Sequence, residues 1–379
     1  MTTKTLVSVV LPCLNEEDSI VTCIQWAKQG LRKLGSHYKG EIIVVDNGST
    51  DRSPVLARYN GAKVITETVR GYGSAYKAGL SKTRGTYIVI ADSDGTYDLR
   101  LIPKFIKKLE RGSDLVLGSR FYGKLKPRTM PFINRYIGNP LLTYMLNVFY
   151  RANISDAHTG MRAFSKNTYK IMNLRSSGME FASEMIVKAI YHKLIISEVP
   201  IPYYERLGKS KLIPTSDAWR HIKFMILFAP TYALVIPGFL FFIFGALLSF
   251  ALLPRGQYLL GWYFDIHTLT VCLFAMNFGV NLFFLGVFAK VFTEKVLKLP
   301  SGPLASFLIS KLTVERLLVS GITILLVSIF IISFIASQWI ASGFGELSKI
   351  REILLATGWA IVGAELMFAS FFYGLLKES

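Results

Sequence analysis

Short apolar runs alternate with polar, helix-compatible stretches through the first half of the chain. The runs that read as buried strands are Leu6–Leu11, Glu41–Asp46, Lys63–Thr66, Tyr87–Ala91 and Leu115–Ser119, with a later strand-like run at Glu198–Tyr204. Their length and β-branched content are typical of buried strands. Strands that alternate with helices at this spacing predict a parallel, Rossmann-like α/β sheet. In such a sheet, ligands bind beyond the carboxyl ends of the strands.

A second pattern begins after residue 228. Four long, nearly uncharged apolar segments follow, at about 230–253, 266–289, 317–341 and 353–376. With a rise of ~1.5 Å per residue, each is long enough to cross a hydrocarbon core of ~30 Å. We therefore expect an α/β catalytic domain at 1–215 and an all-α membrane domain with four transmembrane helices at 230–379. Between them, residues 216–229 mix aromatic and cationic side chains, which predicts an amphipathic helix lying in the membrane interface.

The loop between the second and third segments is rich in lysine, whereas the other two loops carry fewer cations. By the positive-inside rule, this loop, both termini and the catalytic domain are expected in the cytosol. The lack of a secretory pattern at residues 1–5 agrees, and predicts an integral protein of the plasma or inner membrane, or of the endoplasmic reticulum in a eukaryote. The net charge of +18 favours an anionic partner. No nucleic-acid-binding signature accompanies that charge, so nucleic acid is not expected.

The candidate site centres on Asp92-Ser93-Asp94, directly after an apolar run. Two carboxylates one residue apart repel each other unless a cation lies between them, and a hard divalent cation is the usual one. The alternative is an ordinary turn at a strand end, where Asp-Gly is common. Glu16, Asp46 and Arg120 also fall at or just beyond strand ends. This convergence on one edge favours a site.

Several ordered motifs carry a family resemblance. They are Pro-Cys-Leu-Asn-Glu at 12–16, Val-Asp-Asn-Gly-Ser at 45–49, Asp-Ser-Asp at 92–94, Gly-Ser-Arg at 118–120, Asn-Arg at 134–135, Thr-Gly-Met-Arg at 159–162 and Arg-Leu-Gly-Lys-Ser-Lys at 206–211. With them the chain resembles the family 2 glycosyltransferases of the GT-A fold. More closely, it resembles the polyprenyl-phosphate glycosyltransferases related to dolichol-phosphate mannose synthase. Asn47 departs from the second Asp of the family's Val-Asp-Asp-Gly-Ser motif.

The resemblance implies a role for each group of residues. The nucleotide sugar is expected at Pro12, Leu14, Asn15, Glu16, Asp46, Gly71, Asp92, Ser93 and Asp94. The acceptor phosphate is expected at Arg120, Arg135, Asn139, Arg206 and Lys211, and the catalytic residues are Asp94, Arg120 and Arg135. A Mg²⁺ or Mn²⁺ ion is expected at Asp92, Asp94 and Thr96. Because the family often has Gln where Thr96 stands, Asp98 or water is an alternative third ligand.

The activity implied is metal-dependent, inverting transfer of a single hexose from a UDP- or GDP-sugar to a dolichyl or undecaprenyl phosphate. The Gln-x-x-Arg-Trp signature of processive synthases is absent from the sequence, which favours one sugar per acceptor. One alternative is a transferase acting on a lipid or polysaccharide hydroxyl, which needs a carboxylate base such as Glu180, Glu184 or Asp156. Another is a lipid flippase or transport protein with a regulatory head. A homo-oligomer stays open.

The lone acid in the fourth apolar segment, Glu365, bears on the transport alternative, since intramembrane carboxyls often mark transport pathways. We favour a packing contact instead, with Asn277 or Asn281 of the second segment as its hydrogen-bond partner.

Overall fold

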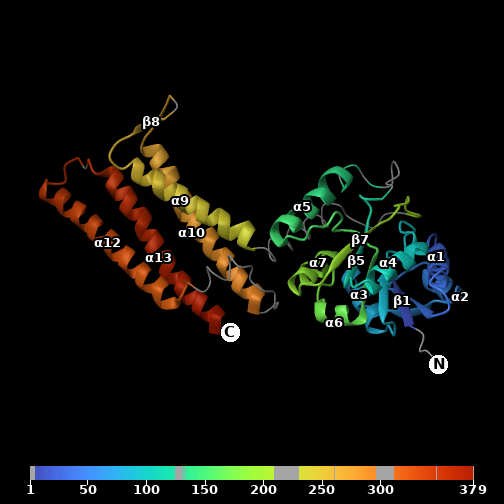
Figure 1. Ribbon diagram of the computed structural model, residues 1–379. Coiled ribbons are helices and arrows are strands. Elements are labelled where there is room, and N and C mark those ends of the chain that lie inside the picture. Colours follow the sequence, from blue (N-terminus) through green and yellow to red (C-terminus); the bar gives the residue numbers. More distant parts are fainter. Residues whose placement is uncertain are drawn as a thin grey trace. The chain divides into compact units, whose positions relative to one another are not determined.

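The computed structural model describes residues 5–123, 130, 132, 134–208, 230–259, 261–295, 311–346 and 348–378. The chain forms two compact units, Met1–Met225 and Ile226–Ser379 (Figure 1). The predicted interfacial helix at 216–229 and the predicted domain boundary at 215 lie outside the described residues.

The first unit is an α/β domain built on a seven-stranded sheet. Its strands are β1 (Thr5–Cys13), β2 (Tyr38–Asp46), β3 (Lys63–Thr66), β4 (Tyr87–Ile90), β5 (Leu115–Ser119), β6 (Arg162–Ser165) and β7 (Ile196–Pro200). Its helices are α1 (Ile20–Arg32), α2 (Ser53–Tyr59), α3 (Tyr72–Ser81), α4 (Ile102–Glu110), α5 (Asn139–Tyr150), α6 (Lys166–Met172) and α7 (Phe181–Tyr191). The strand order is β3-β2-β1-β4-β6-β5-β7.

The sheet is mixed, so the prediction of a fully parallel sheet is wrong in one strand. β6 runs antiparallel to both β4 and β5, whereas the other paired strands are parallel. The chain reaches β6 through residues 156–161, which lie at the edge where β4 and β5 end, and it therefore enters the sheet from that edge. Arg162, the first residue of β6, pairs with Ile90 near the end of β4.

Alternation along β1 explains why helices cover both faces of the sheet (Figure 1). Val7, Val9 and Leu11 join a core cluster with residues of α1 and α4. Val10 points the other way, toward α3, where a side chain at Gly79 would overlap with it. A strand buried on both faces needs a continuous apolar run, which is what the sequence provides. The carboxyl ends of β1, β2 and β4 meet at one edge, and the functional side chains lie there.

The second unit is mostly helical. A short π-helical turn at Thr231–Val235 leads into α9 (Ile236–Ala251), followed by the hairpin strands β8 (Gln257–Leu259) and β9 (Trp262–Phe264), then α10 (Ile266–Lys295), α12 (Val314–Ala341) and α13 (Ile350–Glu378). Four described helices are long and apolar enough to cross a bilayer: Thr231–Ala251, Ile266–Lys295, Val314–Ala341 and Ile350–Lys377. The prediction of four spans is confirmed.

Glycines bring the spans into close contact. A side chain at Gly238 or Gly279 would overlap with the backbone of the facing helix in the α9–α10 pair, and Gly321 and Gly363 have the same relation between α12 and α13. Small residues at such positions let membrane helices approach closely. Glu365 of α13 accepts a hydrogen bond from the side-chain amide of Asn281 at 2.5 Å, so the predicted packing contact is confirmed.

Candidate active site

Asp92 follows β4 and is partly buried. Its Oδ1 accepts hydrogen bonds from the hydroxyls of Tyr72 at 2.9 Å and Tyr76 at 3.3 Å, both on α3. A side chain at Gly160 would overlap with Oδ2. Burial, reinforced by the charge of Asp94, raises the pKa of Asp92 to about 6. Keeping this carboxylate ionised therefore costs free energy, and a nearby cation would reduce that cost.

Asp94, two residues further along, is buried, with 8% of its surface exposed. Its Oδ1 accepts hydrogen bonds from the backbone amide of Thr96 at 3.1 Å and from the Thr96 hydroxyl at 2.6 Å. Its Oδ2 lies 3.3 Å from Nη1 of Arg206. The other arm of that guanidinium, Nη2, lies 2.5 Å from Oε1 of Glu16. Thr96 thus orients Asp94, and Arg206 joins it to the segment after β1.

Ser93, between the two acids, ties the turn to β1 and α1. Its hydroxyl donates to the carbonyl of Pro12 at 2.5 Å, and its carbonyl accepts from the hydroxyl of Ser19 at 2.6 Å. Asp98 is engaged elsewhere, because both of its oxygens contact Arg100, at 2.7 and 2.9 Å. Its contacts do not favour Asp98 as a metal ligand.

The segment after β2 forms a second side of the site. Oδ1 of Asp46 accepts from the amide of Ser49 at 2.9 Å. The Asn47 side-chain amide donates to the carbonyls of Glu67 and Val69, each at 2.9 Å, and its oxygen accepts from the amide of Gly71 at 2.8 Å. Only an amide can donate and accept in this way, since an ionised carboxylate has no hydrogen to donate. This explains why Asn stands where the family motif has Asp.

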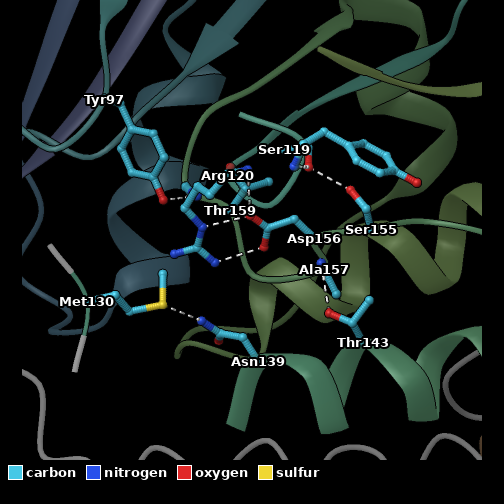
Figure 2. Close-up of polar contacts among 12 residues, drawn as sticks. Tyr97, Ser119, Arg120, Met130, Asn139, Thr143, Ser155, Asp156, Ala157 and Thr159 are labelled. Atoms are coloured by element: carbon cyan, nitrogen blue, oxygen red, sulfur yellow. Dashed lines mark hydrogen bonds and ion pairs between the residues drawn. The ribbon is translucent and has the colours of Figure 1, made fainter. Parts of the chain in front are cut away.

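Arg120, after β5, is buried against Asp156 (Figure 2). Its Nε and Nη2 lie 2.7 and 2.8 Å from the two oxygens of Asp156, and its backbone amide also donates to that carboxylate at 3.0 Å. The guanidinium carbon lies 5.2 Å from the centre of the Tyr203 ring. The pair fixes Arg120 in one orientation at the edge of the site.

Two further acceptor-side residues lie around the start of α5: Arg135 in the helical turn Asn134–Gly138 before it, and Asn139 as its first residue. The guanidinium carbon of Arg135 is 5.3 Å from the centre of the Tyr136 ring. The Asn139 amide contacts the sulfur of Met130 at 3.3 Å (Figure 2). Lys211 lies outside the described residues.

Comparison with known proteins decides the class. A model described as glycosyl transferase family 2 matches residues 8–171, and one described as the family 2 C-terminal transmembrane region matches residues 287–377. The low-salt glycan biosynthesis hexosyltransferase Agl6 of Haloferax volcanii is 39% identical over 378 residues, covering 98% of this chain and 89% of that protein. The chain belongs to glycosyltransferase family 2.

Two further likenesses are partial. The dolichyl-phosphate hexose transferase of Haloferax volcanii is 35% identical over 177 residues, covering 46% of this chain and 75% of that protein. A crystal structure of glucosyl-3-phosphoglycerate synthase from Mycobacterium tuberculosis with Mn²⁺, UDP and its product has a TM-score of 0.46 at 22% identity, covering 59% of this chain and 79% of that one.

The three carboxylates that the sequence offers as candidate bases, Asp156, Glu180 and Glu184, each already accept hydrogen bonds within the domain. Asp156 pairs with Arg120. Glu184 accepts from the backbone amides of residues 175 and 176 and lies 2.7 Å from Lys188. Glu180 accepts from the backbone amide of Gly178 at 3.0 Å.

Arg162 is the residue whose position the sequence did not reveal. It is 1% exposed, and its guanidinium donates to the carbonyls of Thr159 at 3.0 Å, Ala157 at 2.9 Å and Ala182 at 2.6 Å. It thereby holds residues 157–160, and with them Gly160, against Asp92. The signal was present as the last residue of the Thr-Gly-Met-Arg motif, but a motif does not say whether its arginine faces a ligand or the core.

Proposed function

We propose that this glycosyltransferase moves one hexose from a UDP- or GDP-sugar to the phosphate of a membrane polyprenol, at the cytosolic face and with inversion. The named hexosyltransferase relative supports the sugar class. The dolichyl-phosphate hexose transferase supports the acceptor class.

The observation that carries the proposal is the engagement of the candidate bases. A sugar or lipid hydroxyl needs a general base to remove its proton. A phosphate monoester has a second pKa of ~6 and is largely dianionic at neutral pH, so it can attack without one. Asp156, Glu180 and Glu184 are all committed to structural contacts. These contacts favour the phosphate acceptor.

The exposed face of α5 suits an acceptor that arrives from a lipid surface. Leu141, Tyr144 and Val148 are spaced along one stripe of the helix and are 51%, 66% and 44% exposed. Arg135 lies in the short helical turn Asn134–Gly138, directly before α5. Apolar and aromatic side chains beside a cation are typical of a surface that contacts lipid head groups and the upper acyl region.

The acidic turn fits a divalent cation. Mg²⁺ is usually held by one or two carboxylates together with phosphate oxygens. Asp94 and Asp92 would supply the carboxylates. Among the described residues no group of three or more His, Cys, Asp or Glu could hold a metal without such help. When bound, the ion would neutralise charge on the departing nucleoside diphosphate.

The protein's own residues would bring two anionic reactants together. In the proposed step a phosphate oxygen attacks the anomeric carbon of the hexose, and the bond from that carbon to the diphosphate breaks on the opposite side. Arg135 and Arg120 would hold the acceptor phosphate by charge-assisted hydrogen bonds. The fixed orientation of Arg120 lowers the cost of ordering that contact.

The test is to incubate the purified full-length protein in detergent with undecaprenyl phosphate and a panel of radiolabelled UDP- and GDP-hexoses, with Mn²⁺ or Mg²⁺. One sugar should give a labelled lipid that Asp94→Ala abolishes. Arg135→Ala should lose transfer and keep nucleotide binding, and equal loss of both would contradict the acceptor role of Arg135. Label appearing on unphosphorylated polyprenol would favour the hydroxyl acceptor instead.

A further inference from the structure

The segment after β7 lies directly over the acidic turn. Tyr203 forms an isolated bridge with Tyr97, the amide of Tyr204 donates to the carbonyl of Thr96 at 3.0 Å, and the amide of Leu207 donates to the carbonyl of Asp94 at 3.0 Å. These backbone contacts place Arg206 beside Glu16 and Asp94, two acids on the side of the site where the nucleotide sugar is expected.

Arg206 is the positive charge that Asp94 and Glu16 share. Its Nη1 and Nη2 lie 3.3 and 2.5 Å from the two carboxylates, while its Nε is buried without a hydrogen-bond partner. Its side chain remains 23% exposed. Arg162, by contrast, is 1% exposed and donates from Nε, Nη1 and Nη2 alike. Arg206 is thus incompletely satisfied, which is typical of a contact that can be exchanged.

We propose that Arg206 is an exchangeable counter-cation for Asp94, which a divalent cation replaces when the site is loaded. This proposal rests on the proposed function, because that function supplies the anionic acceptor that Arg206 would bind after its release. The released guanidinium would then be free to bind the anionic acceptor, which is the role its motif implies. Metal and donor would bind before the acceptor, because the same arginine cannot pair with Asp94 and with the acceptor phosphate at once.

The physical basis is competition for one carboxylate. Oδ2 of Asp94 is the oxygen that faces Arg206, while Oδ1 already accepts two hydrogen bonds from Thr96. A divalent ion that takes Oδ2 must displace the guanidinium or share the oxygen with it, at the cost of repulsion between two cations. Removing Arg206 removes this competitor, so the metal should bind more tightly.

The decisive experiment is titration of full-length protein in detergent with Mn²⁺ alone, followed by electron paramagnetic resonance of the free ion. Arg206→Ala should lower the Mn²⁺ dissociation constant about tenfold, equivalent to ~1.4 kcal/mol. Arg206→Lys, which keeps the charge, should stay close to the wild type. Arg100→Ala removes a cation that pairs with Asp98, a few residues away, and should leave the affinity unchanged. Unchanged or weaker Mn²⁺ binding by Arg206→Ala would overturn the proposal.

A second measurement reports the movement itself. Hydrogen exchange at the Leu207 amide should accelerate when Mn²⁺ is added to the wild type, because the segment loosens from Asp94, and should not respond in Asp94→Asn. Protection that stays the same or increases with Mn²⁺ would contradict displacement. Neither experiment contains a sugar or an acceptor. A failure to transfer hexose would therefore remove the proposed function without removing the competition, and the reverse outcome is equally distinguishable.

Discussion

The carboxylate of Asp156 and the guanidinium of Arg120 meet through two contacts of 2.7 and 2.8 Å, with side chains that are 0% and 6% exposed. The sequence offered Asp156 as a base and Arg120 as a phosphate ligand. Their pairing makes the acid a positioning residue, whose function is to hold the arginine.

Replacing Asp156 with Asn should therefore destabilise the catalytic unit. Breaking a buried pair by removing one partner leaves an uncompensated charge and typically costs ~3–5 kcal/mol. We expect a clear drop in the thermal unfolding midpoint of the purified protein, with activity lost in parallel. Asp114→Asn is the matched control, because Asp114 only accepts from the backbone amide of Ile195 at an exposed position. An active, fully stable Asp156→Asn protein would contradict the structural role.

Gly160→Ala should disable the acidic turn. The new methyl group would overlap with Oδ2 of Asp92, whose Oδ1 accepts hydrogen bonds from Tyr72 and Tyr76, so the carboxylate cannot shift without breaking these bonds. We expect at least a tenfold loss in turnover, measured as labelled lipid formed per minute. Gly345→Ala is the control, because the added methyl group there would make only ordinary van der Waals contacts with Ser342. It should leave turnover unchanged. Wild-type turnover by Gly160→Ala would show that Asp92 can shift without consequence.

Asn47→Asp restores the residue that the family motif carries, yet it should be harmful here. The substitution removes two hydrogen bonds to the carbonyls of Glu67 and Val69 and sets a charge against them. Each lost bond costs ~0.5–1.5 kcal/mol, and the carboxylate adds repulsion. Denaturant unfolding should show a loss of ~2–4 kcal/mol, and nucleotide titration should show weaker donor binding. A variant as stable as the wild type would contradict the hydrogen bonding described.

Cys13 and Cys23 should resist alkylation while the protein is folded. Burial raises the pKa of Cys13 to about 11 and that of Cys23 to about 12. A raised pKa lowers the thiolate fraction at a given pH, and the thiolate is the reactive form. Iodoacetamide at pH 8 should leave both unmodified by peptide mass spectrometry, and denaturant should expose both. Modification of the folded protein at the rate of a free cysteine would show that the packing of β1 and α1 opens in solution.

The sequence revealed elements that depend on local patterns. The four spans follow from uncharged length alone, and the strands at Lys63–Thr66 and Leu115–Ser119 appear as predicted. β6 was not predicted, because four residues that begin with an arginine do not resemble a buried strand. Its antiparallel pairing also depends on β4 and β5, which are distant in the sequence. Ion pairs between residues that are distant in the sequence could not be predicted either. No pattern near Arg206 indicates that it pairs with Asp94 and Glu16, and none near Asp156 indicates Arg120.

The buried guanidinium of Arg162 has a mechanical consequence for the two acids. It ties the strand β6, the loop before it and the start of α7 together, and so fixes the surface behind Asp92 to the packing of the whole domain. Asp94 faces a segment held by a few backbone hydrogen bonds and one incompletely satisfied arginine. The site is therefore stiff on one side and compliant on the other. Any adjustment to a bound donor should be taken up by the Asp94 side, while Asp92 serves as the fixed point from which the geometry is set.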